Sequence, residues 1–573
     1  MKENKEIQLV DYLSNFISEK GISDVFQLSG GMITQIIDKI SQNPKIKVHT
    51  LFHEQSCAFA VSAYGRIHKT PSIAFATSGP GATNLLTGIG DCYFDSVPAI
   101  FITGQVNTYE LKGDRSIRQL GFQETDIVSM AKPITKLAIQ LDESSDFVEE
   151  LENAFNTAIN GRPGPVLIDI PMNVQRHKIK KNESRLIETN HISKPTNIEL
   201  ISNLLKEAKK PLIWAGNGIH TSNSEILFNE FVEKTKIPTV LSLHAIDLLP
   251  TTSKYRVGMI GSYGNRWANK TVKESDLIFF IGTRIDIRQT GANLLIFENK
   301  KIIHIDIEQG ELNNRVTSEI SIATDLKEFL TQFIAHVDVK FNYSNWLDEI
   351  QSCRNEYPIL NELKIDKNEI NPHKFFGLIS KSQVDRIIYT VDVGSHQMWS
   401  AQSLFFKKKD RFLTSGGMGS MGFSLPAAIG AAVSTDAKVI VIVGDGSFQM
   451  NIQELQYIKA NELNIKIIVV NNQSLGMIRQ FQDSYMEGRY FGTKWGYSTP
   501  DFEKIASAYG IPSKKIKNDN EIDSIIHWFN ESRGPKLLEL SISSNLDVYP
   551  KIAFGQTMDK MEPEFKPNQI EST

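Results

Sequence analysis

The sequence has few of the features that mark secreted, membrane-bound or nucleic-acid-binding proteins. Its three cysteines, Cys57, Cys92 and Cys353, are odd in number and lack metal-ligand spacing, which predicts free, buried thiols in a reducing compartment. No run of about 18 apolar residues could span a bilayer, and the N-terminus lacks the apolar core of a secretory signal. A net charge of −4 provides no basic surface for nucleic acid. We therefore expect a cytoplasmic protein that acts on small molecules.

A chain of 573 residues is too long for one hydrophobic core and predicts three domains. Short apolar strands alternate with helical patterns, which predicts an α/β fold of three doubly wound parallel-sheet domains. The expected domains are residues 1–180, 196–340 and 368–550, with a linker at roughly 175–195 and a polar C-terminal arm at 551–573. The strand-like runs are VFQL, SIAFAT, AIFIT and VLIDI, then PLIWAGNG, VLSL, DLIFFIG and KIIHIDI, and finally IIYTVDVG, KVIVIVGDG, IKIIVVNN and KLLELSI.

One strand–helix–strand unit carries a candidate diphosphate and metal site. The apolar strand 438–443 runs into Gly444-Asp445-Gly446-Ser447, and a second strand ends at Asn471-Asn472, with 24 residues between Gly446 and Asn471. This spacing suits one right-handed crossover, which brings both motifs to the carboxyl edge of a sheet. The Asp445 carboxylate and the Asn472 amide oxygen suit Mg²⁺, and the glycines leave backbone N–H groups for a diphosphate. Either motif alone is read more simply as a turn or a polar strand end, but together they predict this site.

The same motif, GDGSF and then NN with 24 residues between Gly446 and Asn471, resembles the signature of thiamine-diphosphate enzymes. Segments along nearly the whole chain are similar to the large catalytic subunit of the acetohydroxyacid (acetolactate) synthase family. The resemblance implies a pyrimidine-binding, a central flavin-type and a diphosphate-binding domain, with thiamine diphosphate and Mg²⁺ as cofactors. It also implies a homodimer or homotetramer whose active site lies at the subunit interface. The segments include FHEQ at 52–55, TSGPGATNLLTGI at 77–89, GFQETDIV at 121–128, GRPGPVLIDIP at 161–171, VDVGSHQMW at 391–399 and SGGMGSMGFSLPAAIG at 415–430.

The resemblance assigns roles around thiamine diphosphate. Glu54 matches the carboxylate that bonds the pyrimidine ring and favours the tautomer whose exocyclic nitrogen removes the thiazolium C2 proton. Met421 matches the residue wedged between the two rings, and the carbonyl of Gly419 matches a partner of the ring amine. The carbonyl of Ser474 matches a third protein ligand of Mg²⁺, beside Asp445 and Asn472. The remaining matched cofactor contacts are Pro80, Asn84, Ser395, His396, Gly446, Ser447, Gly476 and Met477.

The middle segment resembles the FAD-binding domain of the same family. Glycine-rich strand ends allow a backbone to approach a diphosphate closely. FAD would have a largely structural role here, since carboligation involves no net redox change. A domain that has lost its flavin is the alternative. The matched FAD residues are Arg162, Gly216, Gly218, Arg284, Asp306 and Asp325.

Donor and acceptor sides of the reaction differ in how well they match. Gln123 and Lys136 match residues near the reaction chamber, and Arg288 matches the arginine that binds the carboxylate of the second 2-ketoacid. The acceptor side departs from the family at several positions, which suggests a changed acceptor or neutral drift. Phe481 replaces a tryptophan, Met32 an alanine, Asn107 a proline and Ser262 a methionine.

The sequence therefore predicts a carboligase that decarboxylates pyruvate and joins the two-carbon unit to a second 2-ketoacid, giving an acetolactate-type product. The alternative is acetyl transfer from pyruvate to another ketone or to a nucleotide-linked keto-sugar. A non-catalytic homologue would be expected to have a damaged glutamate or metal motif, and both motifs are intact.

Overall fold

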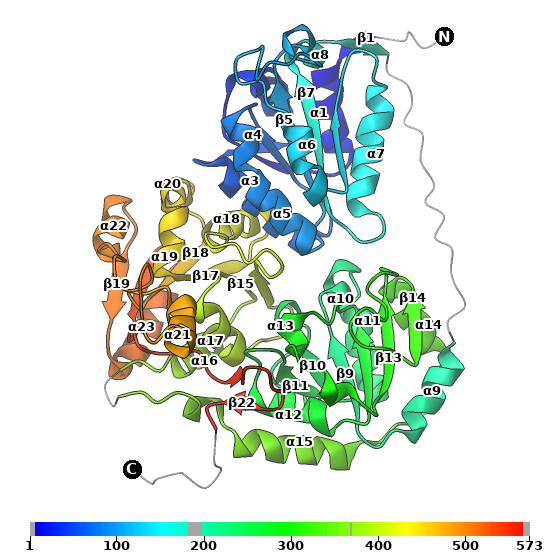
Figure 1. Cartoon of the computed structure of the whole chain (residues 1–573). Coiled ribbons are helices and arrows are strands. Elements are labelled where there is room, and N and C mark those ends of the chain that lie inside the picture. Colours follow the sequence, from blue (N-terminus) through cyan, green and yellow to red (C-terminus); the bar gives the residue numbers. More distant parts are fainter. Residues whose placement is uncertain (1–5, 181–196, 338–339, 367–368, 565–573) are drawn as a thin grey trace. The chain divides into compact units, whose positions relative to one another are not determined.

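The structure is a computed structural model that describes residues 6–180, 197–337, 340–366 and 369–564. Most of the expected linker therefore lies outside the described residues. The chain forms two compact units, one made of residues up to 191 with 415–439 and 447–465, the other of 192–414, 440–446 and the remainder. Three six-stranded parallel sheets form the framework, which confirms the α/β architecture expected from the sequence (Figure 1).

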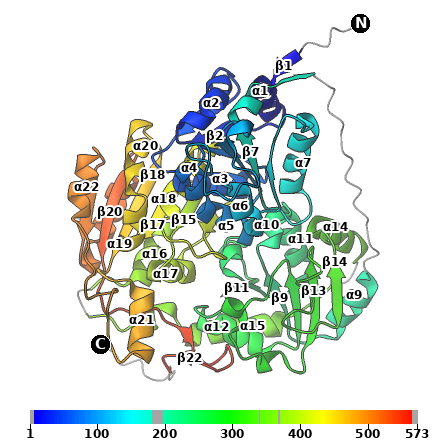
Figure 2. The same ribbon diagram turned by 45° about the horizontal axis from the view of Figure 1, so that its top comes forward.

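The first sheet is covered on both faces by helices. Leu9, Leu13 and Phe16 recur at helical spacing on α1 (Leu9–Glu19), and this apolar stripe packs with α2 (Thr34–Ser41) and α7 (Phe147–Ile159) on one face. Figure 2 shows these three helices around the sheet, and α3 (Glu54–His68) and α5 (Leu86–Phe94) cover the other face. In spatial order the strands are β3 (Lys47–Thr50), β2 (Asp24–Gln27), β4 (Ile73–Ala76), β5 (Ala99–Gln105), β7 (Pro165–Pro171) and β6 (Leu137–Gln140).

The middle sheet has its strands in the chain order 3-2-1-4-5-6, the order of dinucleotide-binding folds. Helices α11 (Glu225–Thr235) and α14 (Leu326–His336) pack on it through aromatic rings, with Phe231 in contact with Phe279 and Phe333. Ligands bind such sheets beyond the carboxyl ends of the strands. The strands in spatial order are β11 (Arg256–Met259), β10 (Thr239–Leu241), β9 (Pro211–Ala215), β12 (Leu277–Ile281), β13 (Lys301–Asp306) and β14 (Ile320–Ala323).

The third sheet repeats the strand order of the first, 2-1-3-4-6-5 in each sheet's own numbering. The single helix expected after the Gly-Asp-Gly turn is divided into α19 (Asp445–Met450), the 3₁₀ turn η7 (Ile452–Glu454) and α20 (Leu455–Ala460). Asn451 interrupts it with a non-helical backbone. The strands are β16 (Arg411–Thr414), β15 (Ile387–Val391), β17 (Lys438–Gly444), β18 (Ile465–Asn471), β20 (Lys536–Ser541) and β19 (Ser513–Ile516), and the other helices used below are α17 (Ser395–Ser403), α18 (Ser424–Ser434) and α21 (Gly476–Tyr485).

The C-terminal segment forms a short hairpin of β21 (Lys551–Ile552) and β22 (Met561–Glu562). Arg266 holds it, because the guanidinium bonds Glu362 at 2.8 Å and donates to the carbonyl of Met561 at 2.9 Å. Met558 and Met561 are buried in the core, a role that the polar composition of this segment does not reveal.

Candidate active site

Three neighbouring strands of the third sheet end at one polar site. Each of β15, β17 and β18 is followed by a helix, so the N-termini of α17, α19 and α21 begin at the same edge. Backbone N–H groups at helix N-termini favour anions. The residues matched to the diphosphate and to Mg²⁺ follow these three strands.

The expected metal ligands lie together at this edge. Burial raises the pKa of Asp445 to about 6, although hydrogen bonds from Tyr497, Gly446, Gln473 and Ser474 oppose the shift. The Tyr497 hydroxyl donates to Oδ1 of Asp445 at 3.0 Å. The loop of Asn472 and Ser474 therefore faces the Asp445 carboxylate, and a cation placed there would favour its ionised form. One carboxylate with amide and carbonyl oxygens fits the ligand preference of Mg²⁺.

A cradle for anionic oxygens lies beside these ligands. A Cβ added to Gly476 would lie 2.5 Å from Oγ of Ser395 and 2.8 Å from Nδ2 of Asn472, so a larger residue there would displace one or both of these side chains. The hydroxyls of Ser395 and Ser474 are buried and have no hydrogen-bond partner among the described residues. Unpartnered buried hydroxyls are costly, and oxygens of a diphosphate would satisfy them. The residues present thus fit thiamine diphosphate.

The His396 ring bonds the backbone at two neighbouring strand ends. Its Nε2 accepts the N–H of Gly444 at 3.2 Å, and the ring also bonds the backbone of Asp392. Burial lowers the pKa of His396 to about 3, so the ring is neutral at physiological pH. The imidazole therefore links the ends of β15 and β17.

Glu54 lies at the start of α3 and is buried. Asn84 Nδ2 donates to Glu54 Oε2 at 2.9 Å, and a Cβ on Gly81 would lie 3.1 Å from Oε1. Pro80 and Asn84 bound α4 (Pro80–Asn84), so this short helix positions the carboxylate. Gln123 belongs to the same neighbourhood, because its Cβ would lie 3.1 Å from a Cβ on Gly79.

Asn451 joins the Glu54 turn to the Met421 turn, a link that no motif in the sequence indicates. Its Oδ1 accepts from Ser56 at 3.1 Å, and its Nδ2 donates to the carbonyl of Gly422 at 2.8 Å and to Gln55 at 3.2 Å. Gly419 and Gly422 both have positive φ and flank Met421. Asn451 therefore holds the backbone beside Met421 to the segment that follows Glu54.

Glu454 bonds the segment that leads into Glu54. Its carboxylate accepts the backbone N–H of Phe52 at 3.1 Å. Burial raises the pKa of Glu454 to about 7, against hydrogen bonds from Ser56 and Phe52. A carboxyl group that is half protonated near neutrality thus contacts Phe52, two residues before Glu54.

Lys136, matched to the donor side, and Met32 and Asn107, which depart from the family on the acceptor side, all make structural contacts. Lys136 Nζ donates to the carbonyl of Asn160 at 2.7 Å. The Met32 backbone bonds Thr77 and Gln175, through its N–H at 3.2 Å and its carbonyl at 2.8 Å. Asn107 caps the 3₁₀ turn η2 (Thr108–Glu110) through a capping box with Glu110. For Asn107 the cap explains the departure from proline, because a proline has no N–H or side-chain amide to offer.

Of the acceptor-side residues, Arg288, Ser262 and Phe481 lie in the other unit. Arg288 lies on the short helix α13 (Ile287–Thr290), and its carbonyl accepts both the N–H of Ser262 at 2.8 Å and its hydroxyl at 3.0 Å. The carbonyl of Ser262 in turn accepts the N–H of Ile552 at 2.8 Å. The changed residue Ser262 therefore connects Arg288 to the C-terminal hairpin.

Four strand ends of the middle sheet carry the residues matched to FAD. Gly216 and Gly218 follow β9, Arg284 follows β12, Asp306 ends β13 and Asp325 follows β14, so all face one edge. The two glycines approach the chain itself, since a Cβ on Gly216 would lie 2.1 Å from the carbonyl of Gly282. Asp325 caps α14 through the N–H groups of Lys327 and Glu328. Arg162, in the first unit, donates to Ser96 at 2.8 Å.

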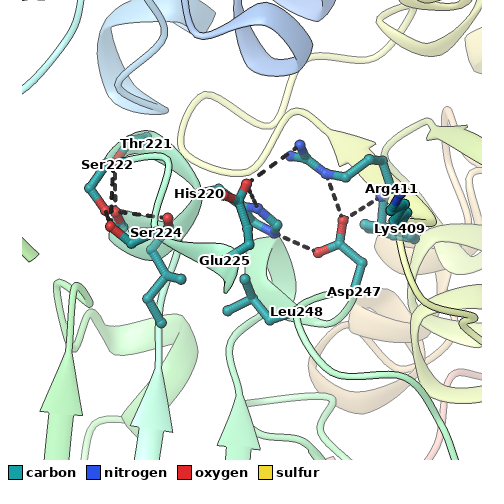
Figure 3. A network of polar contacts seen from close by, with 12 residues as sticks. His220, Thr221, Ser222, Ser224, Glu225, Asp247, Leu248, Lys409 and Arg411 are labelled. Carbon is teal, nitrogen blue, oxygen red and sulfur yellow. Dashed lines mark hydrogen bonds and ion pairs between the residues drawn. The ribbon is translucent and has the colours of Figure 1, made fainter. Parts of the chain in front are cut away.

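A buried charge network holds the turn that follows Gly218. His220, on α10 (Gly218–Thr221), bonds Asp247 and Glu225, each at 2.8 Å (Figure 3). Asp247 also accepts from Arg411 at 3.0 Å. Burial opposes ionisation of Asp247, yet His220 and Arg411 together bring its pKa well below the usual range. The network thereby fixes the glycine-bearing edge of the middle sheet to the start of β16.

Comparison with known proteins agrees with this arrangement. Models of thiamine pyrophosphate enzymes match all three parts: the N-terminal TPP binding domain at residues 7–130, the central domain at 198–333 and the C-terminal TPP binding domain at 392–540. No helix of the described ranges is long and apolar enough to cross a membrane. Fold and strand-edge site together define an enzyme that depends on thiamine diphosphate.

Individual relatives identify the family within this class of enzymes. The chain is 37% identical to the acetolactate synthase large subunit of Lactococcus lactis over 95% of this chain and 94% of the relative. It is 34% identical to acetolactate synthase 1, chloroplastic, of Zea mays over 96% and 88%, and 33% identical to acetolactate synthase isozyme 1 large subunit of Escherichia coli over 96% and 97%. The chain belongs to the acetolactate synthase family of thiamine pyrophosphate enzymes.

Proposed function

We propose that the chain decarboxylates pyruvate and joins the resulting two-carbon unit to a second 2-ketoacid, giving an acetolactate-type product. The observation that carries this proposal is the joint presence of a buried Glu54 and an intact strand-edge site in a chain whose relatives are acetolactate synthases. Thiamine diphosphate, when bound, supplies the electron sink for the carbon that loses CO₂.

The residues of the chain would form a cofactor site and an acceptor site. Asp445, Asn472 and the carbonyl of Ser474 would hold Mg²⁺, and Ser395 with the N-termini of α17 and α21 would bind the diphosphate. Glu54, oriented by Asn84, would hold a proton at the pyrimidine ring. Arg288 would bind the acceptor carboxylate through its guanidinium. Met421 would separate the two rings, since the flanking glycines fix its backbone.

We also propose that FAD binds at the carboxyl edge of the middle sheet. The strand order of that sheet and the shared edge of Gly216, Arg284, Asp306 and Asp325 support it. A visible flavin spectrum in purified protein, released by denaturation, is the expected result. We further propose a homodimer in the cytoplasm, with domains divided at residues 1–180, 196–340 and 368–550.

Incubation of the purified chain with labelled pyruvate, thiamine diphosphate and Mg²⁺ tests the proposed function. Labelled CO₂ and acetolactate are expected in equal amounts. Release of CO₂ with acetaldehyde alone would show a simple decarboxylase. A labelled product that forms only when another ketone or a nucleotide-linked keto-sugar is added would establish the alternative acetyl transfer.

A further inference from the structure

One cation beside Arg288 has no part in the proposed reaction. Lys551 is the first residue of β21, and the next residue, Ile552, bonds the carbonyl of Ser262 at 2.8 Å. Ser262 bonds the carbonyl of Arg288 through both its N–H and its hydroxyl. The backbone at Lys551 is therefore fixed near that of Arg288 through one intervening residue.

The side chain of Lys551 is directed toward the same neighbourhood. Its Nζ lies 3.1 Å from Oε2 of Glu562 and 3.4 Å from Oγ of Ser484, on the last turn of α21. Burial raises the pKa of Tyr263, while Arg288 and Lys551 both act to lower it. Two cations from different segments thus act on one tyrosine hydroxyl.

Exposed aromatic rings lie on the two elements that Lys551 connects, α21 and the C-terminal hairpin. Phe481 lies 4.6 Å from Tyr485, and Tyr485 lies 5.6 Å from Phe554, measured between ring centroids. All three side chains are about half exposed or more, with Phe554 exposed to 82%. Phe481 comes from α21 and Phe554 from the hairpin that carries Lys551. Lys551 and these rings therefore lie on the same two elements, and Ser262 links one of them to the backbone of Arg288.

We propose that Lys551 is a specificity-determining residue for an acceptor that carries a second anionic group, a carboxylate or a phosphate. This inference rests on the proposed function and names the acceptor class at the same site. Arg288 binds the carboxylate next to the reacting ketone, and Lys551 binds the second group. In the free protein the Lys551 ammonium pairs with Glu562; the Lys551 side chain is 16% exposed and the Glu562 side chain 44% exposed, so the carboxylate can turn toward solvent when another anion binds the ammonium. A doubly charged acceptor takes the place of Glu562.

Competition between acceptors tests the proposal. The purified full-length enzyme, with thiamine diphosphate, Mg²⁺ and labelled pyruvate, is offered 2-ketobutyrate against 2-ketoglutarate, and in a second arm against 3-phosphohydroxypyruvate. The wild type is expected to prefer at least one of the doubly charged acceptors. Lys551→Met, which keeps the chain length without the charge, should lower that preference at least tenfold through KM and leave KM for 2-ketobutyrate within twofold. The arm that responds identifies carboxylate or phosphate.

Two further variants separate specificity from structure. Lys551→Arg keeps the charge and should retain most of the preference, and Lys560→Met, an exposed residue of the same hairpin, should change nothing. If neither doubly charged acceptor is preferred, or if Lys551→Met raises KM equally for every acceptor and lowers Tm, the proposal is wrong and Lys551 only pins the hairpin. Acetolactate formation from pyruvate alone in the same preparations shows separately whether the proposed function holds.

Discussion

Asn84 donates a hydrogen bond of 2.9 Å to Oε2 of Glu54, and so fixes a buried carboxylate from a short helix that begins 26 residues later in the chain. Because Glu54 is the proposed proton-holding group, Glu54→Gln should reduce turnover by at least about 10²-fold. Binding of thiamine diphosphate, measured by calorimetry, should remain, since the diphosphate site is untouched. Asn84→Ala should give a smaller loss, because the carboxylate stays but is less well oriented. Full activity of Glu54→Gln would contradict the proposal.

A mixing experiment tests the proposed homodimer. Glu54→Gln and Asp445→Asn should each be inactive alone. Co-expression of the two variants should restore activity to about a quarter of the wild-type level if each site takes Glu54 from one subunit and Asp445 from the other, since half of the dimers then carry one intact site. No recovery, with mixed dimers demonstrated by tagged purification, would place both residues of a site in one chain.

Asn451 should affect both stability and activity. Its replacement by alanine removes hydrogen bonds to Ser56 and Gly422 and leaves the buried carbonyl of Gly422 without that donor. The expected loss is about 1–3 kcal/mol in the free energy of unfolding, with a lower kcat because the Met421 turn loosens. Chemical denaturation and steady-state kinetics check this. Asn461→Ala, an exposed site on the following turn, is the matched control and should be neutral.

Glu454 should make the protein less stable as the pH rises. Its folded pKa, about 7, lies above the ordinary value of 4.5, so between these values the unfolded chain has already lost a proton that the folded chain keeps. The stability contributed by the protonated form is complete below about pH 4.5 and is lost as pH rises through 7, by up to about 1.4 kcal/mol per pH unit. Glu454→Gln keeps an acceptor for Phe52 and should flatten the slope of Tm against pH. Glu462→Gln, at an exposed carboxylate, should leave the slope unchanged.

Removal of Asp247 should break the network of Figure 3. Asp247→Ala leaves His220 and Arg411 without their shared buried partner, at an expected cost of about 3–5 kcal/mol. If FAD binds beside Gly218, the flavin content should fall as well. Glu225→Gln, at a carboxylate that is more exposed, should cost much less. An unchanged Tm in Asp247→Ala would show that the network contributes nothing to stability.

The inner strands of each sheet could be predicted from the sequence, and the edge strands could not. In all three sheets the four central strands coincide with the apolar runs, while the two outermost strands of each sheet were missed. An inner parallel strand is covered on both faces and reads as a continuous apolar run. Edge strands such as KVHT in β3 and SKKI in β19 are partly exposed, carry charges and have no such run.

In the candidate site, too, residues that follow neighbouring strands could be predicted from the sequence, and contacts between distant segments could not. Asp445 and Asn472 could be predicted to meet, because strand order and spacing bring their strand ends together. Asn451, Tyr497 and Lys551 could not, since each acts on a segment far away in the sequence. The close packing of Gly216 and Gly218 against Gly282 likewise joins two strand ends that are far apart in the sequence.

His396 offers a last consequence, because its ring serves one backbone donor and one backbone acceptor. A neutral imidazole used in this way is interchangeable, in hydrogen-bonding terms, with a side-chain amide, which also carries one acceptor and at least one donor. His396→Gln should therefore be tolerated far better than His396→Ala. An exchange of His396 for glutamine or asparagine in a related protein would then keep the hydrogen bonds between the ends of β15 and β17 and leave the neighbouring cofactor site unchanged.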